Sequence, residues 1–336
     1  METASNQTTL PWTWLRHWSA AGWNMMRMPG KSHRGPLPPA DEHLHQLAAH
    51  LQHHVTYLAE QIGERHVPGR AGALNAAAEY VQSQWQAAGC DVKSQPYDVA
   101  GITCRNLEVE FPGTARPDEI VIVGAHYDSV PGSPAANDNA SGTAALLCLA
   151  RDLFNAPRER TLRLVAFVNE EAPYGHTEQM GSWVYARRCR QRGEKVTAML
   201  CLETIGYYSD QPGSQQYPPA IGLLYPSRGD FIAFIGSTRY ARLVRRVVGA
   251  FRRSEPFPSQ AAALPESLSH ITRSDHWAFW RHDYPALMVT DTAPFRYRHY
   301  HTPQDTADKL DFDKTARVVR GLQSVVAALL SEAPDR

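Results

Sequence analysis

Apolar residues recur at helical spacing in the segment that follows Pro38 and Pro39. The positions are Leu44, Leu47, Leu51, Val55 and Leu58, preceded by the acidic pair Asp41 and Glu42 and ended by Gly63. This spacing predicts an amphipathic helix. A second helix is predicted over residues 73–88, ending at Gly89, and a third near the C-terminus, where Val319, Leu322, Val326 and Leu329 share one face.

Farther along the chain, short apolar runs alternate with polar loops and helical patterns. Short strands are predicted around Val92 and over residues 106–111, and longer apolar runs occupy residues 120–124, 162–168, 199–205 and 286–289. This alternation predicts an α/β fold, an open sheet covered by helices on both faces. We find no internal repeat and no linker after residue 40, so we expect one domain over residues 40–336, preceded by an extension over residues 1–39.

The composition of the 336 residues is that of an ordinary globular protein, with 43% hydrophobic and 20% charged residues. These values rule out a disordered chain, a collagen and a coiled coil. The 34 Lys and Arg residues balance 34 Asp and Glu residues, so there is no overall positive field to collect phosphates. The charge balance therefore argues against nucleic acid as a partner.

The cysteines and the chain ends bear on the compartment. The five cysteines are scattered without a Cys-x-x-Cys pair, which favours reduced thiols in the core over disulfides or a thiolate zinc site. No run approaches the ~18 apolar residues of a membrane-spanning helix, and residues 1–9 lack the pattern of a secretory signal. We therefore expect a cytoplasmic protein.

The N-terminal extension is rich in Trp and Met over residues 10–30 and in Pro and Gly over residues 29–39. We expect the Trp-rich part to pack on the domain or on a sister subunit, which would give self-association. Contact with a membrane surface is the alternative.

Histidine is the unusual entry in the composition, with 15 residues. Five of them, His43, His45, His50, His53 and His54, fall on the first predicted helix. No carboxylate or thiol recurs with them in a ligand pattern, so we interpret them as a solvated helix face rather than a metal site.

Other histidines and several acids follow the predicted strands directly. The first long run leads into His126 and Asp128, the second into Glu170 and Glu171, and the third contains Glu203. Active sites of open α/β sheets form at the carboxyl ends of strands. We therefore treat these residues as candidate metal ligands, with Asp128 placed to accept the second N–H of the His126 imidazole.

Two further candidates lie in loops. Asp138 is in a polar loop that opens a helix, where an N-cap is an equally good interpretation, and His301 alone would be a surface histidine. Together with His126, Glu203 and one glutamate of the adjacent pair, they form a donor set that suits zinc, or manganese or cobalt less selectively. Five donors are too many for one open mononuclear site, but they suit two metals bridged by one carboxylate.

The adjacent Glu170 and Glu171 repel each other unless a cation holds them. Neighbouring residues of an extended chain point to opposite sides. One glutamate can therefore bind metal while the other faces water as a general base.

These motifs resemble those of the co-catalytic zinc exopeptidases of metallopeptidase family twenty-eight, which includes bacterial double-zinc aminopeptidases, glutamate carboxypeptidase and glutaminyl cyclase. The resemblance runs from about residue 40 to the C-terminus, in the family's order. It rests on His126-Tyr127-Asp128-Ser129, Asn137-Asp138-Asn139-Ala140-Ser141-Gly142, Asn169-Glu170-Glu171, Glu203 before Ile205-Gly206, Ser274-Asp275-His276 and Tyr300-His301-Thr302.

The resemblance implies roles for the candidate residues. It implies two zinc ions, with Asp138 as the bridging ligand, His126 and Glu203 completing one site, and Glu171 and His301 completing the other. Glu170 would be the general base and Asp128 the partner of His126. The implied fold is a three-layer α/β/α sandwich with a mixed, mainly parallel sheet and a strained cis peptide bond after Asp138.

The chain departs from the family's best-known aminopeptidases at one ligand, because they carry Asp where this chain has Glu203. The longer side chain leaves open a partly occupied site on the His126 side. Ser274-Asp275-His276 is assigned to support of the active-site wall.

The function that the resemblance implies is a zinc-dependent aminopeptidase acting on peptides, through a metal-bridged water activated by Glu170. The candidate substrate contacts are Tyr207, Tyr225, Tyr240 and Arg296. A carboxypeptidase is the nearest alternative and needs a cation for the substrate's carboxylate, for which Arg273, Arg296 and Arg298 are candidates. Glutaminyl cyclase and a non-catalytic relative are the further alternatives.

Overall fold

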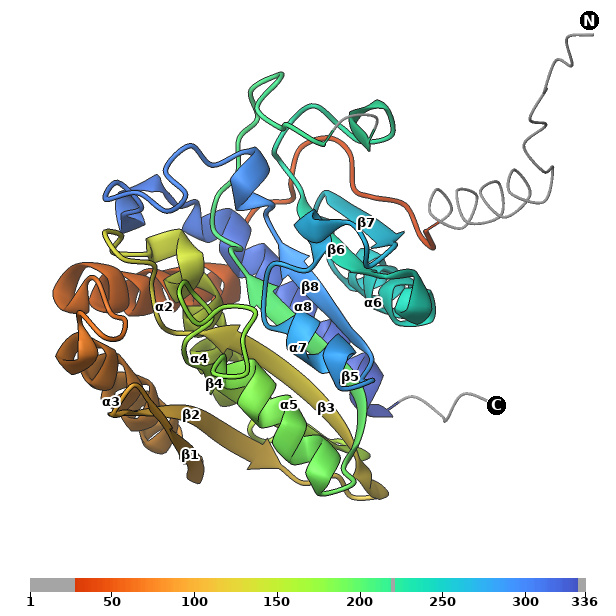
Figure 1. The fold of residues 1–336 in the computed structure, drawn as a ribbon. Helices are drawn as coiled ribbons and strands as arrows, with labels where there is room; N and C mark the ends of the chain where they lie inside the picture. The colour runs from red at the N-terminus through yellow and green to blue at the C-terminus, as the bar shows by residue number, and fades with distance from the viewer. Residues whose placement is uncertain (1–27, 219–220, 332–336) are drawn as a thin grey trace, which may run out of the picture.

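An eight-stranded mixed sheet forms the centre of the protein, in a computed structural model that describes residues 28–218 and 221–331 (Figure 1). The strand order is β1-β2-β4-β3-β5-β8-β6-β7. Four of the seven strand pairs are parallel and three are antiparallel, at β1·β2, β2·β4 and β6·β8. The expected mixed, mainly parallel sheet is confirmed.

From β3 onward strands and α-helices alternate, except between β5 and β6. The strands are β1 (Val92–Val99), β2 (Ile102–Phe111), β3 (Arg116–His126), β4 (Arg160–Phe167), β5 (Lys195–Glu203), β6 (Ile232–Ser237), β7 (Ser259–Leu264) and β8 (Ala286–Thr290). The helices are α2 (Glu42–Thr56), α3 (Ala71–Ala87), α4 (Gly142–Leu153), α5 (Gly181–Gln191), α6 (Ala241–Ser254), α7 (His276–Arg281) and α8 (Phe312–Ser331).

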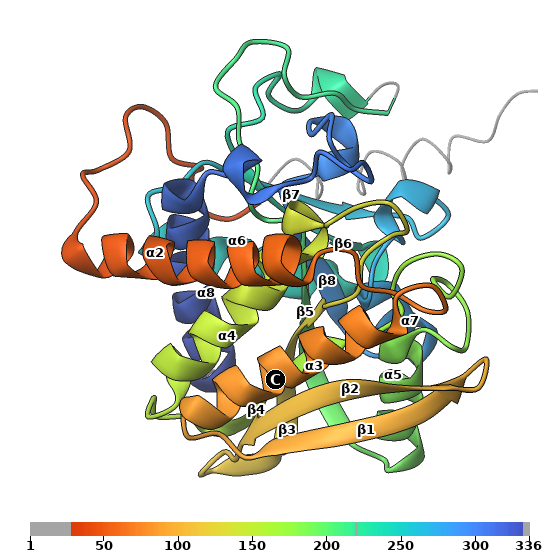
Figure 2. The ribbon, with the colours of Figure 1, turned by 90° about the vertical axis from the view of Figure 1, so that its left-hand side faces the viewer.

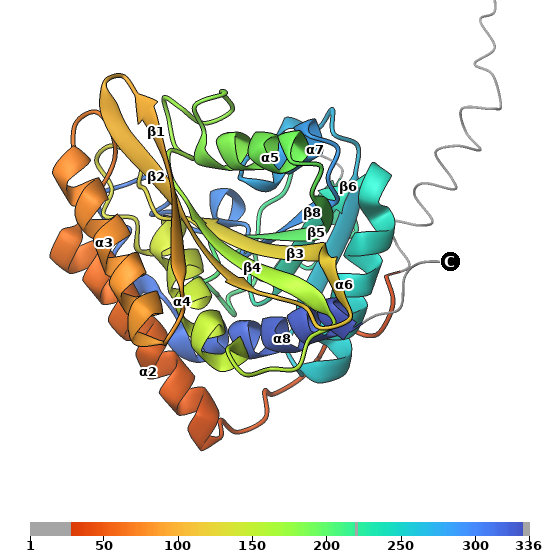
Figure 3. The same cartoon turned by 90° about the horizontal axis from the view of Figure 1, so that it is seen from below.

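Helices cover both faces of the sheet, as Figure 3 shows from below. The helices α5 and α7 lie on one face, whereas α3, α4, α6 and α8 lie on the other, with α2 packed outside on α4 and α8 (Figure 2). Along β3, Ile120 and Ile122 enter the core under α5 and α7, and Val121 and Val123 enter the larger core on the opposite face. This alternation is the period of two that a strand buried on both faces requires.

The two predicted N-terminal helices and the C-terminal helix are present. Asp41 caps α2, because its carboxylate accepts a hydrogen bond of 2.8 Å from the Leu44 amide. The sequence pattern did not predict β6 and β7. Both strands are short, and β7 is built around three alanines, which have a low strand propensity.

Two expectations concern single residue types. All five cysteines are buried and free, in agreement with reduced core thiols. The solvated face assigned to the histidines of α2 is wrong for His54, which is buried and shares a 2.7 Å hydrogen bond with the Tyr80 hydroxyl. His43, His45, His50 and His53 are exposed.

The segment after residue 27 packs along α6 and β7. Arg252 of α6 donates to the Pro29 carbonyl at 3.2 Å, and the Ser259 amide donates to the Ser32 hydroxyl at 2.9 Å. Most of the Trp-rich segment lies outside the described residues, so its packing and the division at residue 39 stay predictions. No helix within the described residues has the length and apolar character needed to cross a membrane.

Candidate metal centre

Three neighbouring strands bring four of the predicted residues to one edge of the sheet. His126 ends β3, Glu203 ends β5, and Glu170 and Glu171 follow β4. Because the strands run parallel in the order β4-β3-β5, their carboxyl ends are adjacent. The sheet therefore fixes the relative positions of these side chains, at the edge where α/β proteins form their sites.

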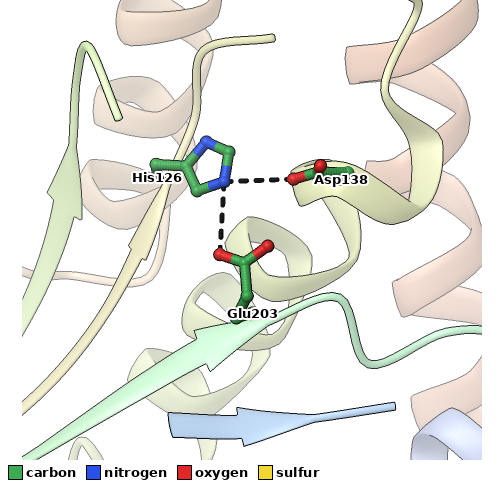
Figure 4. A group of neighbouring side chains, drawn as sticks. All are labelled: His126, Asp138 and Glu203. Atoms are coloured by element: carbon green, nitrogen blue, oxygen red, sulfur yellow. Dashed lines mark ion pairs between the residues drawn. The ribbon is translucent and has the colours of Figure 1, made fainter. Parts of the chain in front are cut away.

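One group of buried donor atoms surrounds the His126 imidazole. Its Nε2 atom lies 3.2 Å from Asp138 Oδ1 and 3.4 Å from Glu203 Oε2 (Figure 4). One donor atom from each of these residues lies within 4.8 Å of the other two. This spacing is compatible with a common metal ion.

A second group lies on the other side of Asp138. His301 Nε2 is 2.9 Å from Asp138 Oδ2 and 3.2 Å from Glu171 Oε1, and one donor atom from each residue again falls within 4.8 Å. Asp138 therefore presents one oxygen to each group, which is the arrangement a bridging carboxylate needs.

Several of these atoms have no hydrogen-bond partner among the described residues. They are both ring nitrogens of His126, Asp138 Oδ1 and Glu171 Oε1, all of them buried. A buried polar atom without a partner costs about 1–3 kcal/mol. Carboxylate and imidazole donors suit a divalent metal such as zinc, so the residues present fit a pair of metal ions.

Neighbouring carboxylates raise the pKa values of the histidines and of Glu171 in this cluster, which reflects an excess of negative charge. Burial alone would lower the pKa of His126, but the neighbouring carboxylates, Glu203 foremost, raise it well above its usual value. Burial also opposes the charge of His301, yet its hydrogen bond to Asp138 and the nearby Glu171 carboxylate raise its pKa to about 10. Burial and the Asp138 charge raise the pKa of Glu171 to about 7. The carboxylates thus require protons or cations as partners.

Buried side chains from distant segments hold the Asp138 loop. The Asp305 carboxylate accepts from the backbone amides of Asn137 at 2.9 Å and Asp138 at 3.2 Å. The Asn139 side chain donates to the Leu202 carbonyl at 2.7 Å. The peptide bond between Asp138 and Asn139 is cis, as the resemblance implied. Asp138 does not cap α4, whose N-cap residue is Ser141, so the N-cap interpretation is wrong.

Asp128 connects His126 to the glutamate pair. Its Oδ1 atom lies 3.4 Å from His126 Nδ1, which is long for a hydrogen bond. The same carboxylate accepts from the amides of Glu170 and Glu171, each at 3.2 Å. Asp128 therefore orients the chain after β4 as well as facing the imidazole.

The two adjacent glutamates point to different parts of the cluster. Glu171 reaches His301, whereas Glu170 Oε2 lies 3.9 Å from His126 Nε2, with 13% of its side chain exposed. Burial, reinforced by Glu203 and Glu171 against the charge of His126, raises the pKa of Glu170 well above its usual value. Glu170 is thus partly open to solvent beside the two donor groups.

Backbone strain gathers around the same residues. Asn169, Thr204 and His301 have positive φ angles of 60°, 49° and 58°. The left-handed region is uncommon for residues other than glycine, above all for a β-branched residue such as Thr204. Such strain clusters at functional sites, where the surrounding structure holds it.

Two cavities meet at the cluster. One, of about 140 Å³, is mostly apolar, and the other, of about 310 Å³, opens over the glutamate pair. Glu203, Arg273 and Tyr300 line both cavities. The apolar cavity is walled mainly by aromatic and aliphatic side chains, among them Tyr217, Tyr225, Ile235, Leu264, Leu268, Met288 and Phe295.

The candidate substrate contacts lie in different places. Tyr225 lines the apolar cavity, and its hydroxyl donates to a backbone carbonyl at 3.2 Å. Tyr207, Tyr240 and Arg296 line neither of these two cavities. The Arg296 guanidinium is buried and donates to the Gln215 side chain and to backbone carbonyls.

Two residues that were not singled out as site residues lie at the cluster. The Tyr300 ring stacks on the His301 ring with a centroid distance of 3.8 Å. The Ser274 hydroxyl donates to Glu203 Oε2 at 2.6 Å and so orients that carboxylate, which gives the assigned wall-supporting role of its motif a contact. In the sequence, only their position next to the other residues of the Tyr300-His301-Thr302 and Ser274-Asp275-His276 motifs pointed to them.

Comparison with known proteins gives one family. The family model for Peptidase family M28 matches residues 106–326. The chain is 38% identical over 287 residues to the uncharacterized protein YfbL of Escherichia coli, covering 83% of this chain and 87% of that protein. It is 48% identical to aminopeptidase YwaD of Bacillus subtilis over 65 residues, which are 19% of this chain and 14% of that protein.

A solved structure gives the same architecture. The zinc aminopeptidase BSAP of Bacillus subtilis superposes with a TM-score of 0.67, covering 86% of this chain and 96% of that chain at 16% identity. At this identity the likeness concerns the fold.

Proposed function

Because the chain belongs to peptidase family M28, we propose that it is a zinc-dependent aminopeptidase, an exopeptidase that removes N-terminal residues from peptides. The observation that carries the proposal is the pair of donor groups sharing Asp138, with Glu170 beside them at an open cavity. The names of similar proteins, a zinc aminopeptidase among them, support the choice of metal and reaction.

The proposed ligands divide into two sets. His126 and Glu203 would hold one zinc ion, Glu171 and His301 the other, and Asp138 both. Zinc supplies Lewis acidity, which polarises a carbonyl group and lowers the pKa of an attacking water. The Ser274 hydroxyl orients Glu203, and Asp305 fixes the backbone at Asp138, so neighbouring residues hold two of the proposed ligands in position.

Glu170 is the proposed proton carrier. Its carboxylate would take a proton from the attacking water and deliver it to the leaving amine. The Glu170 side chain is partly exposed and its Oε2 atom lies 3.9 Å from His126 Nε2, so it faces the space in which that water would be held. Asp128 keeps Glu170 in place through the Glu170 backbone amide.

The two cavities suit a substrate that lies across the cluster. The apolar cavity beside Glu203 would take the side chain of the N-terminal residue, and the cavity over Glu170 would take the rest of the peptide. Tyr300 lines both cavities, and its hydroxyl is the proposed donor to the oxygen that becomes negative during the reaction.

The alternatives differ in their chemistry. In a glutaminyl cyclase with a single zinc ion, the donor group around His126 would bind no metal. For a carboxypeptidase, Arg296 is not available to the substrate, because its guanidinium is buried among protein acceptors. Of the other two candidate cations, Arg273 lines both cavities and Arg298 lines neither.

Substituting the general base tests the proposal. In Glu170→Gln, metal content and thermal stability should be retained, whereas kcat for a peptide with a free N-terminus should fall by about 10³-fold or more. Glu178→Gln is the matched control, because Glu178 is an exposed glutamate of the loop after β4 and lines neither cavity. Unchanged turnover in Glu170→Gln would exclude the proposed role.

A further inference from the structure

Arg273 occupies the boundary between the two cavities. It lines both of them and is exposed. Neither cavity has another lysine or arginine in its lining within the part of the chain that the structure describes. Arg273 is therefore the one permanent positive charge that a substrate lying across the cluster would meet.

Three carboxylates lie in the same cavity as the Arg273 guanidinium. Glu170, Glu171 and Glu203 line the cavity of about 310 Å³ with it. Under the proposed function these carboxylates would be used for metal binding and proton transfer, and two divalent ions would compensate most of their charge. The guanidinium then remains as a cation for a ligand.

A dipeptide would place one residue in each cavity. With the first side chain in the apolar cavity and the peptide bond beside Glu170, the second residue falls in the cavity of about 310 Å³. Consecutive Cα atoms lie about 3.8 Å apart, so the carboxylate of the second residue would come within reach of a long side chain at the boundary. In a longer peptide that position holds a neutral amide.

We infer that Arg273 binds the free C-terminal carboxylate of a dipeptide whose first residue is apolar, and so selects dipeptides among possible substrates. The inference rests on the proposed function and names its substrate class. A guanidinium pairs with a carboxylate through two parallel hydrogen bonds, which gives both affinity and orientation. The pairing holds substrate and transition state alike, so its effect belongs in KM.

The test compares three substrates with the zinc-loaded protein: Leu-Leu, its C-terminal amide, and Leu-Glu with an amidated C-terminus. We expect the wild type to have a KM for Leu-Leu about tenfold or more below that for Leu-Leu amide. In Arg273→Gln the ratio of the two KM values should approach one, and Arg273→Lys should be intermediate. Arg281→Gln, at an exposed arginine of α7 outside both cavities, should keep the wild-type ratio.

Binding to the Glu170→Gln protein, measured by calorimetry, separates this inference from the proposed function. Tighter binding of Leu-Leu than of its amide, lost in Glu170→Gln/Arg273→Gln, supports the carboxylate site even if no substrate is cleaved. Equal affinities for Leu-Leu and its amide would overturn the inference even if both are cleaved by the wild type. Binding of Leu-Glu amide as tight as that of Leu-Leu would overturn the terminal carboxylate in favour of a side-chain carboxylate.

Discussion

At the scale of single residues, most donors of the cluster could be named from the sequence, because each follows a strand or lies in a motif. Asp138 and His301 had ordinary alternative interpretations, and only their combination with the strand-end residues favoured a metal site. The residues that hold the donors were not predictable in the same way. Ser274 and Asp305 reach the cluster across 71 and 167 residues of chain, contacts that no local pattern encodes.

Arg65 is the clearest of these supporting residues. It is fully buried, and its guanidinium donates to the carbonyls of Tyr127 at 2.6 Å, Pro134 at 2.7 Å and Ala135 at 3.1 Å. These carbonyls lie just after His126 and just before Asp138. Arg65 thus joins the end of β3 to the loop that carries the shared carboxylate.

We predict that Arg65→Lys lowers the free energy of unfolding by about 2–4 kcal/mol. Lysine keeps the charge, but its single ammonium group cannot donate to all the carbonyls that surround the planar guanidinium. The buried carbonyl oxygens left without a donor destabilise the fold. Urea denaturation of the metal-free protein measures the change. Arg70→Lys, at a largely exposed arginine, should be nearly neutral, and an equal stability of the Arg65 and Arg70 variants would contradict this role.

At the scale of elements, the strongly periodic helices and the β-branched strands were predictable, and the weakly patterned strands were not. The helix α2 has both a regular apolar face and a capping aspartate, so local and tertiary preferences agree. The strand β6 forms by pairing with β7 and β8, and the edge strand β7 forms by pairing with β6. Their small residues allow this pairing but do not form a recognisable strand pattern in the sequence.

A hydrogen bond joins His54 of α2 to the Tyr80 hydroxyl of α3, and His54 is neutral in this buried position. Burial lowers the pKa of His54 to about 4, with smaller contributions from His53 and His50, below the usual value of 6.5. The unfolded chain therefore binds a proton between these pH values when the folded protein does not. The contribution of His54 to stability is therefore complete above pH 6.5 and is lost as the pH falls toward 4.

We predict that this loss reaches on the order of 3 kcal/mol between pH 7 and pH 4 and is absent in His54→Gln. Denaturation measured at a series of pH values gives the difference between the two proteins. His45→Gln, at an exposed histidine of the same helix that does not contribute to the pKa shift of His54, should keep the wild-type slope. The same pH slope in wild type and His54→Gln would show that another group is responsible.

At the scale of the whole molecule, the sheet, its covering helices and the site depend on one another. The formal charge of the chain is zero, yet several carboxylates are buried together at one edge of the sheet. The α/β architecture was predictable, because the alternation of strands and helices is a property of the entire chain. The two cavities were not, since their walls come from loops and strands without a common sequence pattern.

We predict that removing metal destabilises the entire fold. Ligand at about 100 times its Kd stabilises a protein by about 2.7 kcal/mol, so stripping the proposed ions should lower Tm by roughly 5 °C. Thermal melting with and without EDTA, followed by zinc addition, measures this shift. Asp138→Ala, which removes the shared ligand, should melt at one temperature in all three conditions. A Tm of the wild type that EDTA leaves unchanged would speak against structural coupling of the metals.

The central claim is that the site cleaves peptides from a free N-terminus. The most direct measurement compares hydrolysis of Leu-Leu and N-acetyl-Leu-Leu by the zinc-loaded protein under identical conditions. The account predicts rapid cleavage of the free peptide and at least about 100-fold slower cleavage of the blocked one, because the blocked amine carries no charge and adds bulk at the cluster. Cleavage of both peptides at the same rate would contradict an aminopeptidase, and cleavage of neither would contradict the peptidase itself.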